Sequence, residues 1–311
     1  MDKLITTETN SKEIQLPDLV KGYVSASISD RTKKEYRDDL QRFLNWGGDI
    51  PASAETVASY LSEHAETHKA ATLERWKISI SKAHSTQKLD DPTKTDLVKL
   101  TLKGIRRTHG TAQRRVNPAL KEDILAMVGN INGSDNLKDM RDKALLLIGF
   151  AGALRRSELV ALNVEDIQEN RDGLTVTITR SKTDQEGQGQ KIGIPYARGS
   201  HCPVKSFKAW IEAAGISEGA VFRSVSRHGK VGDRLHHHSV ARIVKNSAKR
   251  IGLDPKDFSG HSLRAGLATS AAQAGVPVHR ICSQTRHKST RMLDRYIRDG
   301  RLFDDNAAGI L

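Results

Sequence analysis

Apolar residues recur at helical spacing through the first third of the chain. From Ser29 the stripe runs through Tyr36, Leu40, Phe43, Leu44 and Trp46 until Gly47, where a helix would end. Similar stripes predict helices near 19–24, from about 53 to 61, over 72–83 and from Pro92 onward. We therefore expect a polar, flexible tail over residues 1–16 and an all-helical domain over residues 17–110.

The pattern changes in the second part of the chain, which we assign to another domain over residues 119–300. Helices are predicted over 119–129, from 137 to about 152, where the run is apolar all round, and from about 155 to 162. Residues 174–179 alternate apolar residues with Thr, and 191–195 repeat the alternation, so a β-hairpin is expected, with Lys182 at its start. From Pro203 we expect helices again. The fold class is mainly α with a small β-sheet.

Composition points to a polyanionic partner. The 311 residues carry a formal net charge of +13 and a sequence pI of about 9.7, and 28% of them are charged. Nucleic acid fits this charge better than a membrane surface, because the basic residues are not gathered in one amphipathic helix. Cys202 and Cys282 have no metal-ligand spacing and are expected to be free thiols. With no secretory signal in the first residues, a cytoplasmic, nucleoid-associated protein is expected.

Two stretches concentrate the positive charge. Between Lys99 and Lys121 there are seven Lys or Arg and no acidic residue, and residues 111–118 are typical of a linker. This linker is either a solvated connector or a basic strap along DNA phosphates, and we favour the strap. Residues 223–250 hold eight Lys or Arg against one Asp. The candidate DNA-binding residues, expected mainly at phosphates, are Arg106, Arg107, Arg114, Arg115, Arg242 and Lys245.

Candidate chemistry gathers near the C-terminal end. His261 and Arg264 are three residues apart and would share one helix face, where a guanidinium beside an imidazole suits a phosphate. Tyr296 could be either a buried aromatic residue or a nucleophile. The consecutive residues His236 to His238 cannot converge on one ion, so no metal site is expected there.

In chain order, Arg155, Lys182, His261-x-x-Arg264, His287 and Tyr296 resemble the tyrosine recombinases, the phage integrase family. Resemblance extends over most of residues 17–300, and it implies a helical, SAM-like core-binding domain followed by the family's mixed catalytic domain. Two positions depart from the pattern: Arg286 stands where Gly is usual, and Arg156 where an apolar residue is usual. The register with Ser157-Glu158-Leu159 selects Arg155 as the family's first arginine.

The resemblance implies a site-specific recombinase that cuts and rejoins DNA through a 3′-phosphotyrosyl intermediate, without metal, ATP or other cofactor. Tyr296 would be the nucleophile, and Arg155 and Arg264 would bind the phosphate. His261 would accept the tyrosine proton and His287 would donate to a phosphate oxygen, while Lys182 would protonate the leaving 5′ oxygen. Glu158 would orient an arginine or a histidine without touching DNA.

The implied partners are double-stranded DNA with an inverted-repeat core site and three further copies of the chain, forming a tetramer on two sites. No membrane partner is expected, and an accessory directionality factor is left open. Residues 301–311 are expected to dock on a neighbouring protomer, because apolar residues follow the candidate nucleophile. Two alternatives remain: a type IB topoisomerase-like enzyme that relaxes DNA, and a non-catalytic basic DNA-binding protein.

Overall fold

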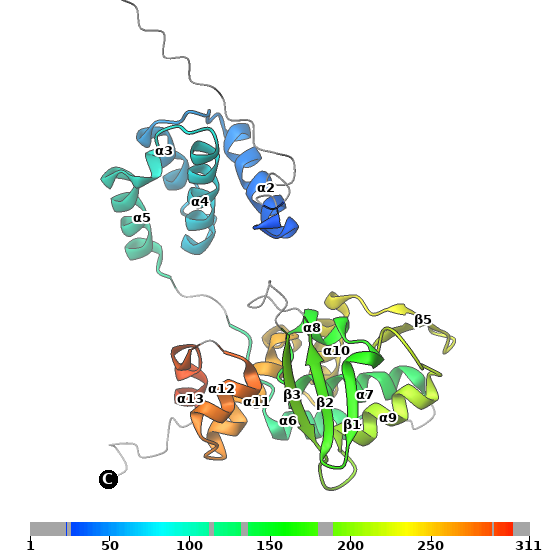
Figure 1. Cartoon of the computed structure of the whole chain (residues 1–311). Helices are drawn as coiled ribbons and strands as arrows, with labels where there is room; N and C mark the ends of the chain where they lie inside the picture. The colour runs from blue at the N-terminus through cyan, green and yellow to red at the C-terminus, as the bar shows by residue number, and fades with distance from the viewer. Residues whose placement is uncertain are drawn as a thin grey trace, which may run out of the picture. The chain divides into compact units, whose positions relative to one another are not determined.

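The chain forms two compact units, Met1–Gln113 and Arg114–Leu311 (Figure 1). The computed structural model describes residues 23, 26–111, 115–131, 136–179, 189–287 and 289–300. The proposed N-terminal tail, Arg114, Lys182 and the segment 301–311 lie outside these residues. Within the described ranges, no helix is both long and apolar enough to cross a bilayer.

Helices build the described part of the first unit. Their bounds are α2 Asp30–Trp46, α3 Ala54–Glu63, α4 Ala70–Thr86 and α5 Asp96–His109, with a 3-10 turn at Pro92–Lys94 before α5. Helix α2 begins where the Ser29 side chain accepts a hydrogen bond from the Thr32 amide, and it ends at Gly47, whose φ of 109° favours glycine. The core contains the fully buried aromatic residues Phe43, Tyr60 and Trp76.

One buried residue of α2 is charged, and the apolar pattern did not predict it. Asp39 is 2% exposed and accepts hydrogen bonds from Arg75 at 2.8 Å and Ser79 at 3.2 Å, both on α4. With these partners available, Asp39 lies on the buried face one turn before Phe43. Leu44, which was expected on that face, is 38% exposed because it is turned away from Phe43 by one helix position.

The second unit combines helices with two small sheets. A three-stranded antiparallel sheet has the order β1-β2-β3, with Leu174 opposite Ile194 and Val176 opposite Ile192. A two-stranded sheet, β4-β5, lies further along the chain. The elements are α6 Lys121–Gly129, α7 Leu137–Ala151, α8 Arg156–Ala161, β1 Ile167–Asn170, β2 Gly173–Ile178, β3 Gln190–Pro195, α9 Pro203–Ala213, β4 Arg223–Val225, β5 Val231–Arg234, α10 His237–Arg250, α11 His261–Gln273, α12 Val278–Thr285 and α13 Asp294–Gly300.

The mainly helical fold with a small sheet matches the predicted fold class, but three strands were missed. The prediction that the chain is helical throughout after Pro203 was wrong, because β4 and β5 form a hairpin there. Strand β1 was also missed. Its residues are mostly exposed, and both β4 and β5 are short, so none of these strands shows the apolar alternation that marks β2.

Helix α7 is the centre of the second unit's core. Its residues from Ala144 to Gly149 are all buried, and it packs against α9 and α11. Figure 1 shows the three-stranded sheet beside these helices. Since α8 follows α7 after a short turn and α11 packs on α7, the core fixes the positions of the segments that carry Arg155 and Arg264.

The segment that leads into α6 is held against α11 by a very close backbone approach. The Ala119 amide donates to the Ser262 carbonyl at 3.0 Å, and Asn117 donates to Asp257 at 2.6 Å. A Cβ atom added at Gly266 would lie only 1.7 Å from the Ala119 carbonyl oxygen. Glycine is therefore required at this position by the neighbouring backbone, and not by its own conformation.

Gly266→Ala should destabilise the second unit by about 3 kcal/mol, because the backbone of Ala119 would have to move away from α11. The matched control is Gly104→Ala in α5, where an added Cβ meets no atom within 4 Å and the gain in helix propensity should stabilise by about 0.5–1 kcal/mol. Thermal unfolding of both variants checks this. Equal effects of the two substitutions would contradict the close approach.

Candidate active site

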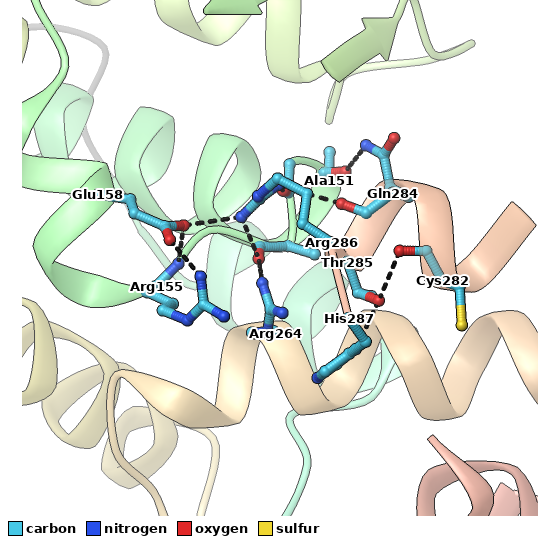
Figure 2. A network of polar contacts seen from close by, with 11 residues as sticks. Ala151, Arg155, Glu158, Arg264, Cys282, Gln284, Thr285, Arg286 and His287 are labelled. Atoms are coloured by element: carbon cyan, nitrogen blue, oxygen red, sulfur yellow. Dashed lines mark hydrogen bonds and ion pairs between the residues drawn. The ribbon is translucent and has the colours of Figure 1, made fainter. Parts of the chain in front are cut away.

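The polypeptide brings five of the six candidate catalytic residues to one region of the second unit. Arg155 is the residue before the first turn of α8, and His261 and Arg264 lie in the first turn of α11. His287 follows the C-terminal end of α12, and Tyr296 is on α13. Figure 2 shows Arg155, Arg264 and His287 in this region. The sixth candidate, Lys182, lies outside the described residues.

Tyr296 and His261 are in direct contact. The Tyr296 hydroxyl lies 2.9 Å from His261 Nε2, and the ring centroids of Tyr296 and His287 are 6.3 Å apart. Tyr296 is partly buried, and it lies close enough to Arg264 to influence the pKa of that guanidinium. The sequence left open whether Tyr296 was a buried aromatic residue or a candidate nucleophile. In the structure, its hydroxyl contacts His261 and lies near Arg264 of the same chain.

Glu158 is a buried carboxylate between two arginines (Figure 2). Its Oε1 atom accepts from Nη1 of Arg155 at 2.6 Å, and its Oε2 atom accepts from the Arg155 amide at 2.9 Å. Oε2 also accepts from Nη2 of Arg286 at 2.7 Å. Burial alone would raise the pKa of Glu158, but the charges of Arg286 and Arg155 and the bonds from Arg155 together lower it. The carboxylate is therefore ionised at neutral pH.

Arg264 is almost fully buried and only partly bonded. Its Nη1 atom donates to the Ala153 carbonyl at 2.8 Å, whereas Nη2 has no acceptor among the described residues. Burial, followed by repulsion from Arg155 and Arg286, lowers the pKa of Arg264 to about 10. The guanidinium thus stays charged at neutral pH. An unpaired N–H in a buried position is unfavourable by about 1–3 kcal/mol and favours an incoming oxygen ligand.

Both histidines are neutral at physiological pH. Burial, and then the charges of Arg264 and Arg155, lower the pKa of His261. The same causes in the same order, with smaller contributions from His261 and Arg286, lower the pKa of His287 to about 4. When the neutral ring carries its proton on Nδ1, the lone pair of His261 Nε2 can accept a proton from the Tyr296 hydroxyl that touches it.

Thr285 determines which nitrogen of His287 carries the proton. The Thr285 hydroxyl lies 2.6 Å from the Ile281 carbonyl and 2.7 Å from Nδ1 of His287. Since the hydroxyl has one hydrogen and a carbonyl cannot donate, the hydroxyl donates to Ile281 and accepts from Nδ1–H. Nε2 of the neutral ring is then unprotonated. His287 can donate from Nε2 only after it gains a second proton.

Arg286 was noted in the sequence only as a replacement for the family's usual glycine. Its backbone is left-handed, with φ 56° and ψ 42°, a conformation that costs a non-glycine residue roughly 1–2 kcal/mol. Its side chain is 3% exposed and reaches Glu158. The contact with Glu158 has no sequence signal, because it depends on how α12 packs against the turn before α8.

The candidate DNA-binding residues are spread over both units. Arg106 on α5 is exposed and forms an ion pair with Glu74 at 3.1 Å, and Arg107 and Arg115 are exposed. Arg242 and Lys245 lie on α10, which packs against α8. Their contacts with DNA remain a prediction. His236 to His238 cap and begin α10, and no group of metal-ligating side chains occurs within the described ranges.

The lowered pKa of His287 predicts a specific loss of stability in acid. The unfolded chain binds a proton near the ordinary His pKa of 6.5, whereas the folded chain does so only near 4. The free energy of unfolding should therefore be fully present above pH 6.5 and fall as pH drops towards 4. In His287→Asn, this fall should be smaller by roughly 1–2 kcal/mol, given a partly solvated ring. Denaturant unfolding at a series of pH values tests this, and identical pH profiles would contradict it.

Comparison with known proteins identifies the family. The profile described as the phage integrase family matches residues 119–301. An integrase/recombinase xerD homolog of Selenomonas ruminantium is 40% identical over 291 residues, covering 90% of this chain and 85% of that protein. The recombinase cre of Escherichia phage P1 is 24% identical, with 80% and 77% of the two chains covered.

Solved structures show the same fold. A lambda integrase dimer bound to a COC′ core site has a TM-score of 0.62 at 17% identity, covering 93% of this chain and 77% of that one. The XerH recombinase bound to palindromic difH substrate also has a TM-score of 0.62, at 18% identity, with 83% and 72% covered. The family profile and the 40% identical relative together show that this chain belongs to the phage integrase family and is a tyrosine-type site-specific DNA recombinase.

Proposed function

We propose that Tyr296 attacks a DNA phosphodiester and forms a 3′-phosphotyrosyl intermediate in the site built from Arg155, His261, Arg264 and His287. The observation that carries this proposal is the 2.9 Å contact between the Tyr296 hydroxyl and His261 Nε2, next to the arginine cluster. In this step the tyrosine oxygen bonds to phosphorus and the bond from phosphorus to the 5′ oxygen breaks. Because the phosphodiester energy is kept in the new bond, resealing needs no ATP.

The charges of the site suit this reaction. Glu158 forms ion pairs with Arg155 and Arg286, and Arg264 shares the Ala153 carbonyl with Arg286, so these four side chains carry two net positive charges. Attack on a phosphodiester creates a phosphorane with two negative charges, and fixed donors are most effective where such charge develops. Arg264 still has an unpaired Nη2 group, and Arg155 uses Nη1 for Glu158. Both arginines thus retain donors for the phosphate oxygens.

Proton movements follow from the protonation states of the histidines. The neutral His261 ring accepts the Tyr296 proton as the tyrosine attacks. When the phosphate binds, His287 takes up a second proton from solvent on Nε2, since a nearby negative charge favours the charged imidazole, and Nε2–H then donates to a phosphate oxygen. From the family resemblance, Lys182 is proposed to protonate the leaving 5′ oxygen.

The partners proposed are duplex DNA and further copies of this chain. The net charge of +13 and the exposed arginines on α5 and α10 support binding along DNA phosphates. We assign core binding to residues 17–110, with a basic connection over 111–118, and catalysis to residues 119–300. One related fold is that of a lambda integrase tetramer bound to a Holliday junction, which supports a tetramer acting on two inverted-repeat sites.

Tyr296→Phe should abolish covalent attachment to DNA while changing affinity less than about twofold, because only the nucleophilic oxygen is lost. The substrate is a nicked duplex carrying the sequence that the full chain selects from a random-sequence library. Denaturing gel electrophoresis detects the covalent complex. A covalent complex of normal yield in Tyr296→Phe would refute the assignment. Formation of recombinant products from two plasmids that each carry the site would distinguish strand exchange from DNA relaxation, because relaxation gives no exchanged product.

The segment 301–311 is proposed to dock on a neighbouring protomer. Its large apolar residues are Leu302, Phe303, Ile310 and Leu311. Deletion of residues 302–311 should leave binding to a single half-site unchanged and reduce assembly on two complete sites at least about tenfold, because each docked segment would link two protomers. Native gels and light scattering provide the measurement. Normal tetramer assembly by the deletion variant would refute the docking.

A further inference from the structure

Arg286 occupies an unusual position directly before His287. Helix α12 ends there, and the residue adopts the left-handed conformation that glycine enters freely. In this turn a glycine would cap the helix with less strain. The presence of a large charged side chain therefore calls for a compensating interaction elsewhere.

The Arg286 guanidinium finds that compensation inside the protein (Figure 2). Nη1 donates to the carbonyls of Gly152 and Gln284, each at 3.1 Å. Nη2 donates to the Ala153 carbonyl at 3.2 Å and to Oε2 of Glu158 at 2.7 Å. All four hydrogens of the two amino groups thus have protein acceptors. Nε is buried as well, without a partner among the described residues.

Two of these acceptors are shared with the arginines that the proposed function assigns to the phosphate. Glu158 also binds Nη1 of Arg155, and the Ala153 carbonyl also accepts from Nη1 of Arg264. The Glu158 carboxylate therefore links Arg286 to Arg155, and the Ala153 carbonyl oxygen links Arg286 to Arg264. Ala153 itself is at a positive φ of 44°, in the tight turn between α7 and α8, so its carbonyl direction is set by that turn.

We propose that Arg286 is a positioning residue that sets the orientation of Arg155 and Arg264 through Glu158 and the Ala153 carbonyl. This inference rests on the proposed function of those two arginines. Arg286 does not itself bind the phosphate, because its amino groups are already used by the protein. Without it, Glu158 would lose one of its two charged partners, and the carbonyls of Gly152 and Ala153 would lose their hydrogen bonds from α12.

Other residues at the end of α12, next to His287, are also held by hydrogen bonds. His287 follows Arg286 immediately, and its Nδ1 is held by Thr285. Gln284, on the other side, donates to the carbonyls of Ala151 and Gly193. The end of α12 is therefore anchored to α7, to β3 and to the turn before α8. Arg286 is the member of this anchor that also contacts the charged cluster.

The test compares Arg286→Gly and Arg286→Lys with the wild-type chain on the selected nicked duplex. We expect Arg286→Gly to slow covalent-complex formation at least about tenfold in single turnover, with half-site affinity changed less than about twofold. Arg286→Lys should be intermediate, because an ammonium can pair with Glu158 but cannot reach all four acceptors. A rate for Arg286→Gly within about twofold of wild type would overturn the proposal.

Arg141→Lys is the control for simple loss of stability. Arg141 is another buried arginine of the same unit, paired with Asp142 at 2.6 Å and outside the charged cluster. Arg141→Lys should lower the midpoint of thermal unfolding but leave the cleavage rate of the folded protein within about twofold of wild type. If Arg286→Gly and Arg141→Lys slow cleavage equally, Arg286 has only a structural role. Should Arg286→Gly fail to fold, Arg286→Lys is judged against the same control.

A double-mutant cycle with Glu158→Gln identifies the route of the effect. If Arg286 acts through Glu158, the slowing caused by Arg286→Gly should shrink when Glu158→Gln is already present. An undiminished effect would contradict that route. If the wild-type chain cleaves DNA and Arg286→Gly cleaves it at the same rate, this inference is refuted while the proposed function stands. If the wild-type chain forms no covalent complex, the proposed function fails first and the inference falls with it.

Discussion

The buried carboxylate of Glu158 is the interaction on which the proposed site depends. Guanidinium groups repel one another, and burial removes the water that would screen them, so three arginines need a counter-charge to remain together. Glu158 supplies it from the first turn of α8, where it also caps the helix by accepting from the Arg155 amide. Local helix formation and the assembly of the charged site therefore depend on the same side chain.

The rest of the second unit positions the arginines and histidines around this carboxylate. The buried helix α7 leads into the turn whose Ala153 carbonyl binds Arg264 and Arg286, while α11 carries Arg264 together with His261. Burial, together with the surplus positive charge, lowers the pKa of both histidines and keeps them neutral. One of them can then accept a proton from Tyr296, and the site is prepared for an anion before DNA arrives. Such preorganisation is the main source of electrostatic stabilisation in enzymes.

Sequence alone could predict the parts that depend on local pattern. Helical stripes, the β2–β3 hairpin and the i, i+3 relation of His261 and Arg264 follow from periodicity, and the family resemblance selected Arg155 over Arg156. Asp39 was missed because its partners on α4 are distant in sequence, whereas β1, β4 and β5 were missed because these short strands lack the apolar alternation of a half-buried strand. The contacts of Arg286 were equally hidden, since they join α12 to a turn more than 120 residues earlier, as the separation of 128 positions from Glu158 shows.

The most direct test of the account is to identify the residue and the DNA end that become joined. Trapped complexes from the nicked duplex can be digested with protease and nuclease, and the remaining nucleotide-linked peptide sequenced by mass spectrometry. The account predicts a single peptide containing Tyr296, with the phosphate joined to its phenol oxygen and to the 3′ end of the cut strand. Attachment through another residue, or through a 5′ phosphate, would contradict it.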